Sequence, residues 1–233
     1  PLWSRGLGDV YKRQVMLGPP AGSSDTLFYG RNYDGSAGAL SESVSLTNNG
    51  TITSNSAAQT DGTYGSQPLD FYGVLNITNS GIIRAYNQNT INAWGGLNVT
   101  NNTGATISAV PDVNGNGWTA LMGNSPVYLQ NITSVTPSMT VLNNGTISAT
   151  GNWGTAVGFS GGGVFSLTNN GTIIGGNQNG AAVWTNYSAA GSTILNRGSI
   201  SAGSGGHGVF IDSAANSPTG SGTRILTLSL IHI

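Results

Sequence analysis

The eight-residue phrase S-L-T-N-N-G-T-I at residues 166–173 recurs along this chain of 233 residues. Six copies align on one glycine, and successive glycines are separated by 23 residues (Gly81 to Gly104) to 41 residues (Gly104 to Gly145). Internal similarity at intervals of about 20–50 residues is typical of repeat proteins, in which each repeat stacks on its neighbours. The aligned glycines are Gly50, Gly81, Gly104, Gly145, Gly171 and Gly198.

Three other positions of the phrase are nearly constant. Five copies carry an apolar residue four positions before the glycine, an asparagine two before it and an isoleucine two after it. The copy at Gly104 carries two extra residues, and there Val99, Asn101 and Ile107 fill these roles. The phrase asparagines are Asn48, Asn79, Asn101, Asn143, Asn169 and Asn196.

The phrase predicts two strands joined by a corner. Phe165, Leu167 and Asn169 alternate with polar residues, as in a strand with one buried face. We expect the glycine that follows to adopt a positive φ, which would cost another residue about 1–2 kcal/mol. Isoleucine then begins a second strand. Because the same buried face continues, the phrase describes one bend of a coil rather than a hairpin.

A third strand between successive phrases completes each turn of the coil. Glycine, asparagine, serine and threonine with β-branched residues between them disfavour a helical repeat of this length. We therefore expect an all-β fold, a right-handed single-stranded parallel β-helix of about six rungs. The third strands are expected at residues 69–71, 91–93, 119–121, 155–157, 181–183 and 208–210, and longer loops at 110–117 and 131–137.

Two further segments extend the pattern. Residues 26–29 resemble a third strand, and residues 223–227 resemble a seventh phrase, with Ile225 and Thr227 in the roles of Phe165 and Leu167.

The six phrase asparagines share one register, and they alternate in step with the residues that face the core. We expect them to stack as a ladder inside one corner, because a buried amide needs hydrogen-bond partners and stacked amides supply them.

Both ends of the chain resemble translated sequencing-adapter DNA. Residues 9–14, D-V-Y-K-R-Q, can be coded by GATGTGTATAAGAGACAG, and its reverse complement codes L-S-L-I-H-I, the sequence of residues 228–233. One DNA element read on its two strands thus accounts for both ends. We expect residues 1–14 and 228–233 to be non-native, and residues 15–227 to be a piece of a β-helical protein truncated at both ends.

Charge and cysteine content narrow the function classes. Residues 15–227 hold four arginines, no lysine and seven carboxylates, so four positive and seven negative charges leave a net charge of −3. A nucleic-acid partner is not expected, since it requires a basic face. The chain has no cysteine, which removes disulfides, thiolate metal ligands and cysteine nucleophiles.

The repeated N-N-G-T-I phrases, with G-x-A-V strands between them, resemble the passenger regions of autotransporters, which Gram-negative bacteria secrete by the type V route. The resemblance covers about residues 43–227, and filamentous haemagglutinin-like adhesins are similar. It implies a non-catalytic adhesin or structural stalk at the cell surface, attached to the outer membrane through a C-terminal barrel missing from this sequence. It also implies a glycan or protein partner on a host or bacterial surface.

A polysaccharide-degrading enzyme is the alternative. Gly206-His207-Gly208 matches the G-H-G of polygalacturonases, which are also β-helices, but their N-T-D, D-D and R-I-K motifs are absent. Inverting glycosidases also need two carboxyl groups about 6.5–9.5 Å apart. In the repeat frame His207 precedes a third strand, where Gly154 and Gly180 occupy similar places. We expect no catalytic residue in this chain.

The carboxylates show no cation-binding pattern. The calcium sites of pectate lyases need several carboxylates around the ion. The acids here follow no common spacing, and the G-G-x-G-x-D repeat of calcium-binding β-rolls is absent. No metal or cofactor is therefore expected. The acidic residues are Asp25, Asp34, Glu42, Asp61, Asp70, Asp112 and Asp212.

Four tryptophans lie beside the expected third strands. Trp94 and Trp184 follow their strands, whereas Trp118 and Trp153 precede theirs. An aromatic strip on a polar rod would suit stacking of sugar rings, so these four are candidate glycan contacts. Packing at the corners of the coil would suit them equally, because tryptophan buries a large area.

A coil cut at both ends would expose strand edges, and we expect such a piece to self-associate end to end.

Overall fold

A computed structural model describes residues 15–17, 28–30, 43–54, 67–112, 114–123, 137–186, 191–212 and 225–228. These residues contain 21 β-strands and no α-helix. The strands form three sheets of seven strands each, and paired strands run parallel. None of the described segments is a helix long and apolar enough to span a membrane.

The three sheets, named A, B and C, share the strands in strict rotation. Sheet A holds β1 (Val15–Leu17), β4 (Thr51–Thr53), β7 (Ile82–Tyr86), β10 (Thr106–Val110), β13 (Thr146–Ala149), β16 (Thr172–Gly175) and β19 (Ser199–Ala202). Sheet B holds β2 (Phe28–Gly30), β5 (Leu69–Phe71), β8 (Ile91–Ala93), β11 (Thr119–Gly123), β14 (Thr155–Phe159), β17 (Ala181–Asn186) and β20 (His207–Asp212). Sheet C holds β3 (Ser43–Asn48), β6 (Val74–Asn79), β9 (Gly96–Asn101), β12 (Met139–Asn143), β15 (Phe165–Asn169), β18 (Thr193–Asn196) and β21 (Ile225–Leu228).

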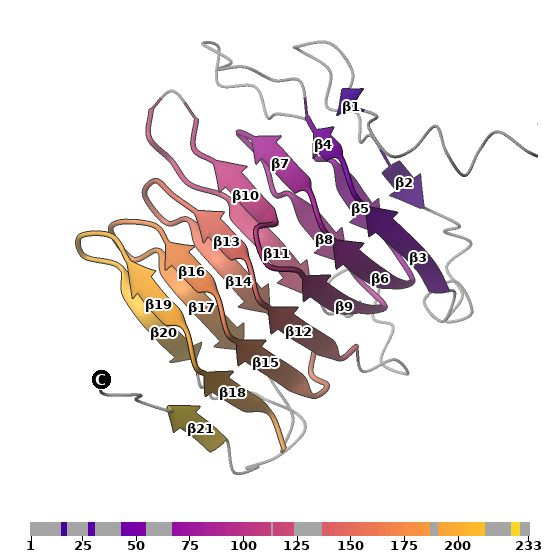
Figure 1. Cartoon of the computed structure of the whole chain (residues 1–233). Helices are drawn as coiled ribbons and strands as arrows, with labels where there is room; N and C mark the ends of the chain where they lie inside the picture. Colours follow the sequence, from indigo (N-terminus) through magenta and orange to yellow (C-terminus); the bar gives the residue numbers. More distant parts are fainter. Residues whose placement is uncertain are drawn as a thin grey trace, which may run out of the picture.

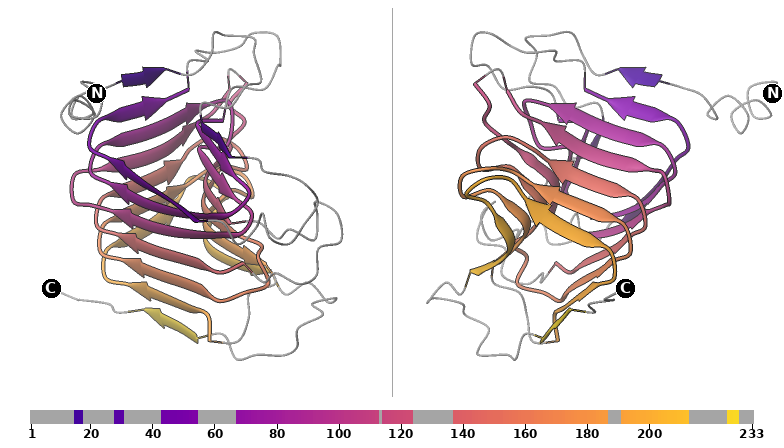
Figure 2. Two further views of the ribbon diagram at one scale, coloured as in Figure 1. Left: turned by 90° about the vertical axis from the view of Figure 1, so that its right-hand side faces the viewer. Right: turned by 60° about the vertical axis from the view of Figure 1, so that its left-hand side comes forward.

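Neighbouring strands of each sheet are three elements apart in the chain, so the chain passes from A to B to C and returns to A one rung further along. Figure 1 shows this right-handed coil, and the two views of Figure 2 show its rungs stacked one on another. Strands β3 to β20 make six rungs, flanked by β1 and β2 at one end and β21 at the other. The predicted parallel β-helix is therefore confirmed.

The third strands lie where the sequence predicts them. β5 and β8 have the predicted bounds, and β11, β14, β17 and β20 are longer. Residues 28–30 form the additional third strand β2. The predicted loop at 110–117 largely connects β10 to β11, whereas the predicted loop at 131–137 lies outside the described residues except for Pro137.

The register predicted for the seventh phrase is wrong by one residue. Leu226, and not Thr227, pairs with Ile194, which itself pairs with Leu167. A one-residue shift exchanges the two faces of a strand. In the sequence, Leu226 and Leu228 are a more apolar alternating pair than Ile225 and Thr227, so the observed register suits the alternation pattern better. Leu228 belongs to the segment predicted to be non-native, and it still takes a place in β21.

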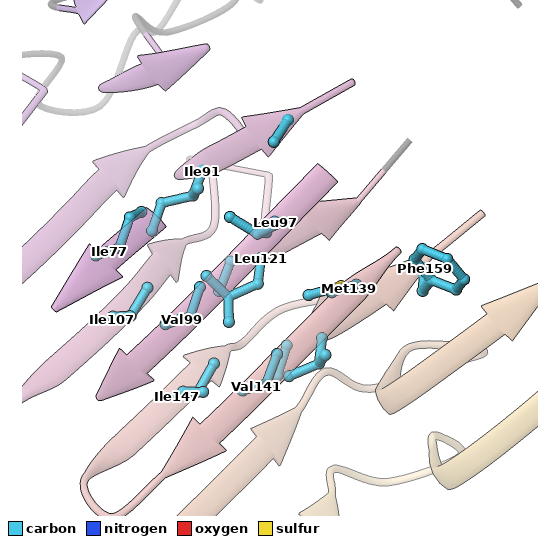
Figure 3. Packing of buried hydrophobic residues seen from close by; sticks show 14 of the residues in the cluster. Ile77, Ile91, Leu97, Val99, Ile107, Leu121, Met139, Val141, Ile147 and Phe159 are labelled. Atoms are coloured by element: carbon cyan, nitrogen blue, oxygen red, sulfur yellow. The ribbon is translucent and has the colours of Figure 1, made fainter. Parts of the chain in front are cut away.

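The core runs along the axis of the coil, between the inner faces of the three sheets. Figure 3 shows its apolar side chains, among them Ile107, Leu121 and Val141, converging from the three sheets. Burying one such side chain stabilises the fold by about 1.5–3 kcal/mol. Large and small residues complement each other. A Cβ on Gly123 would lie 3.0 Å from the ring of Phe159.

Candidate functional site

The six phrase asparagines form one continuous ladder in the corner between sheets C and A. In each step, the side-chain Nδ2 of one asparagine donates to the Oδ1 of the asparagine on the next rung, over 2.7–2.9 Å. Asn48 is 6% exposed, and the next four asparagines are fully buried. The ladder runs through Asn48, Asn79, Asn101, Asn143, Asn169 and Asn196.

Each ladder amide also holds the backbone of the corner. Nδ2 of Asn143 donates to the carbonyl oxygen of Gly145 (3.2 Å) and to that of Thr172 on the next rung (3.2 Å). The backbone N–H of Gly50 donates to Oδ1 of Asn48 (3.1 Å). The fold therefore uses the polar atoms of the ladder, which makes the ladder a structural element rather than a binding site.

Most corner glycines are required by close stacking and not by a left-handed backbone. Gly104 has a φ of +79°, but the expectation of a positive φ is wrong for Gly81, Gly145, Gly171 and Gly198. A Cβ on Gly171 would overlap the carbonyl oxygen of Gly145 on the preceding rung. That carbonyl accepts a hydrogen bond from Thr172 N (2.9 Å), so the rungs cannot separate to make room.

Ala105, and not Gly104, occupies the stacking position of the rung with two extra residues. Thr106 N donates to the carbonyl oxygen of Gly81 (2.9 Å), and Thr146 N donates to that of Ala105 (2.9 Å). Apart from Gly104 and its two chain neighbours, no described residue has an atom within 4 Å of the position that a Cβ on Gly104 would take. Gly104 therefore serves the local turn, and the repeat register passes through its neighbour.

The four tryptophans do not form one strip. Trp94 follows β8 at the corner between sheets B and C, where its ring stacks on Tyr72 (centroids 5.9 Å apart) and its Nε1 donates to Asp70 Oδ1 (3.1 Å). Trp118 packs against the core, and its Nε1 donates to Asn87 Oδ1 (3.0 Å). These two indoles are held by the fold.

Trp153 and Trp184 differ from the first two. Trp184 lies within β17, half-buried, and its register partners on the neighbouring strands are Gly158 and Phe210. Trp153 lies at the corner between sheets A and B, is 55% exposed and has a φ of +62°. Sequence reasoning missed the exposed aromatic Phe210 (41% exposed), because nothing in its local pattern sets it apart.

His207 is the first residue of β20, and its register partner is Ala181. Its predicted alignment with Gly154 and Gly180 is therefore wrong by one residue, because the strand begins earlier than the G-x-A-V pattern suggests. The imidazole is exposed and stacks on the ring of Phe210, with centroids 5.1 Å apart. Among the described residues, the histidine is thus paired with an aromatic ring rather than with a carboxylate.

The described carboxylates lie on separate rungs. Asp70 is in β5, Asp112 follows β10 and Asp212 ends β20. Asp70 is 8% exposed and accepts a hydrogen bond from Asn92 Nδ2 (3.1 Å). The four remaining acids, Asp25, Asp34, Glu42 and Asp61, lie outside the described residues.

Asp112 organises the loop between β10 and β11. Its Oδ1 accepts from the backbone N–H groups of Asn114 (2.9 Å) and Asn116 (2.8 Å), and its Oδ2 accepts from Asn116 Nδ2 (2.9 Å). Desolvation raises the pKa of Asp112, but these hydrogen bonds together lower it by a larger amount. The pKa therefore lies below its ordinary value of 3.8. Within the described part of the chain, no group of three metal-ligating side chains occurs.

A shallow depression lies on the outer face of sheet C, over β3, β6, β9 and β12. Its polar side chains bond to one another along the coil: Asn98 Nδ2 donates to Asn76 Oδ1 (2.8 Å), and Asn76 Nδ2 donates to Ser43 Oγ (2.8 Å). This face is an uncharged surface of hydroxyls and amides.

No family model, curated protein or solved structure matches this chain.

Proposed function

We propose that this chain is a piece of the passenger region of an autotransporter-type surface protein. In this proposal the β-helix is a rod outside the outer membrane of a Gram-negative bacterium. It carries or displays a surface that adheres to glycans or proteins, and it catalyses no reaction.

The observation that carries the proposal is the unbroken asparagine ladder through six rungs. A ladder of this kind stabilises a coil at every step, so its length can grow by adding rungs without a new core. The close glycine contacts beside it act in the same way. Such a chain favours extension along one axis, which is what a stalk or a displayed adhesive surface needs.

The separation of two described carboxylates, Asp70 and Asp212, is too large for a glycosidase pair, which favours the rod over the polysaccharide-degrading alternative. Asp70 and Asp212 lie on strands of sheet B that are five steps apart. At about 4.8 Å for each step, the strands are about 24 Å apart. Glycosidases of the inverting type place their two carboxyl groups about 6.5–9.5 Å apart.

Surface display of the full 233-residue chain tests the proposal. The chain is placed between a secretion signal and an autotransporter translocator unit in a Gram-negative strain. We expect protease added to intact cells to digest it, and the cells to adhere to glycan-coated or cell-coated surfaces more than cells with the translocator alone. Retention inside the cell, or release of reducing ends from pectin-type polymers that His207→Ala abolishes, would contradict the proposal.

The ends of the chain are part of the same proposal. We propose that residues 1–14 and 228–233 derive from adapter DNA and that residues 15–227 derive from the passenger. Amplification of the source DNA with primers inside residues 43–212 should yield different sequence beyond both ends. Recovery of the same two hexapeptides from independently prepared DNA would show that they are native.

A further inference from the structure

Trp153 stands in a backbone conformation that tryptophan rarely adopts. Its φ of +62° lies in the left-handed region, where a bulky residue is a true outlier. The side chain is 55% exposed, and the indole makes no hydrogen bond or ring contact with any other residue in the described part of the chain. Among the described residues, no hydrogen bond or ring contact of the side chain therefore offsets the strain.

Neighbouring rungs hold the backbone of Trp153 in place. Its N–H donates to the carbonyl oxygen of Asn177 (3.1 Å) on the next rung. The residue before it, Asn152, donates to Gly115 O (2.7 Å) and accepts from Gly117 N (2.6 Å) on the preceding rung. Strained residues that their surroundings over-determine occur preferentially at ligand sites, so this outlier points to a function.

The next rung, whose backbone accepts a hydrogen bond from Trp153 N, carries three exposed side-chain amides. Asn177, Gln178 and Asn179 on the next rung are exposed, and their side chains bond to no other residue that the structure describes. The loops of this corner stack along one edge of the coil (Figure 1), between β10 and β11, β13 and β14, β16 and β17, and β19 and β20. Asp112 is the only ionisable residue described in these four loops.

We propose that Trp153 and the amides of Gln178 and Asn179 form a binding site for a neutral carbohydrate. A pyranose ring has an apolar face of C–H groups that can cover an indole, and hydroxyls at its rim. An amide is both donor and acceptor, as a hydroxyl requires. The near absence of charge favours a neutral sugar over an acidic one. This site deepens the proposed surface function and would be one of the places where the rod contacts a glycan.

Calorimetric titration of the full chain tests the site. The probes are the soluble hexamers of β-1,4-linked glucose and of β-1,4-linked N-acetylglucosamine. We expect at least one of them to bind. Trp153→Asn should raise its Kd at least about tenfold, since a tryptophan that becomes covered on binding carries a large share of the binding energy. Phe210→Ala removes another exposed aromatic residue and should leave the Kd unchanged.

The melting temperature gives a second readout, which shows whether Trp153 serves ligand binding or the stability of the fold. Asparagine tolerates a left-handed backbone better than tryptophan, so Trp153→Asn should keep the melting temperature or raise it by a few degrees. A lower melting temperature, an unchanged Kd for Trp153→Asn, or no binding of either hexamer by the unaltered chain would each overturn the site. If cells that display the chain still adhere while the purified chain binds neither hexamer, this site fails and the surface-rod proposal stands.

Discussion

Asparagine 169 shows how much one side chain contributes to this fold. Its Nδ2 donates to Asn196 Oδ1 (2.7 Å), to the carbonyl oxygen of Gly171 (3.3 Å) and to that of Ser199 (3.1 Å). Its Oδ1 accepts from Asn143 (2.8 Å). One amide thus joins three rungs and closes its own corner. The next residue, Asn170, is exposed and donates to Asn144 Oδ1 (2.8 Å) on the outside.

The first prediction compares these two neighbours. Asn169→Ala should lower the free energy of unfolding by about 1–3 kcal/mol, because buried partners lose their hydrogen bonds. Asn170→Ala should change it by less than about 0.5 kcal/mol, as exposed substitutions usually do. Urea unfolding followed by circular dichroism measures both. Equal effects of the two substitutions would show that the ladder is not a main source of stability.

The second prediction separates two reasons for glycine. Gly104→Ala should cost about 1 kcal/mol, because alanine is disfavoured at a φ of +79° but has open space around its methyl group. Gly171→Ala should cost about 3 kcal/mol or more, because the methyl group meets the backbone of the preceding rung. The same unfolding measurement applies. A larger loss for Gly104→Ala would mean that backbone conformation, and not rung spacing, selects glycine here.

At the scale of one element, the loop between β10 and β11 depends on the charge of Asp112. Its carboxylate accepts three hydrogen bonds from Asn114 and Asn116, and Gly115 N donates to the Asp112 carbonyl oxygen (3.0 Å). These bonds favour the ionised carboxylate, so its pKa is lower in the folded loop than in the unfolded chain.

The third prediction gives the sign of the pH dependence. Because the folded pKa of Asp112 is depressed, its contribution to stability is complete above the unfolded value of about 3.8 and is lost as pH falls through the lower folded pKa. An NMR titration should show the Asp112 carboxyl changing with a midpoint below 3.8, with the Asn114 and Asn116 amides following it. In Asp112→Asn these amides should not titrate. A midpoint at or above 3.8 would contradict the loop geometry.

At the scale of the whole molecule, stability comes from stacking, and burial decreases at the last rung of the described part. Val183 in β17 is fully buried, whereas its register partner Val209 in β20 is only half-buried. Ile173 and its partner Ile200 differ in the same way. Among the described strands, β19 and β20 end their sheets, so this face of the described part presents strand edges beside apolar side chains.

The fourth prediction follows from that face. Exposed strand edges recruit other chains, and a head-to-tail contact between unlike ends does not close. Sedimentation of the full chain should therefore show association that grows with concentration. Phe210→Ser with Ile211→Asp should reduce it, whereas Val164→Ser, which alters an exposed residue beside sheet C, should not. A monomer at every concentration would show that this face is covered.

Much of this molecule can be predicted from one rung of sequence. Alternating apolar residues, a constant asparagine and an isoleucine two positions after the glycine specify strand, corner and strand, because these patterns act over a few residues. The ladder positions Asn48 to Asn196 and the third strands followed from register alone. Even the irregular copy was aligned, since Val99, Asn101 and Ile107 kept their parity.

Only the tertiary structure decided which atoms meet between rungs. The need for glycine at Gly171, the stacking of Ala105 in place of Gly104, and the register of Leu226 depend on contacts across 20 or more residues of sequence. The same holds for the tryptophans. Trp94 and Trp118 find hydrogen-bond acceptors on other rungs, and the Trp153 indole finds none among the described residues. Local pattern sets the direction of a side chain, but its partners come from the rungs stacked above and below it.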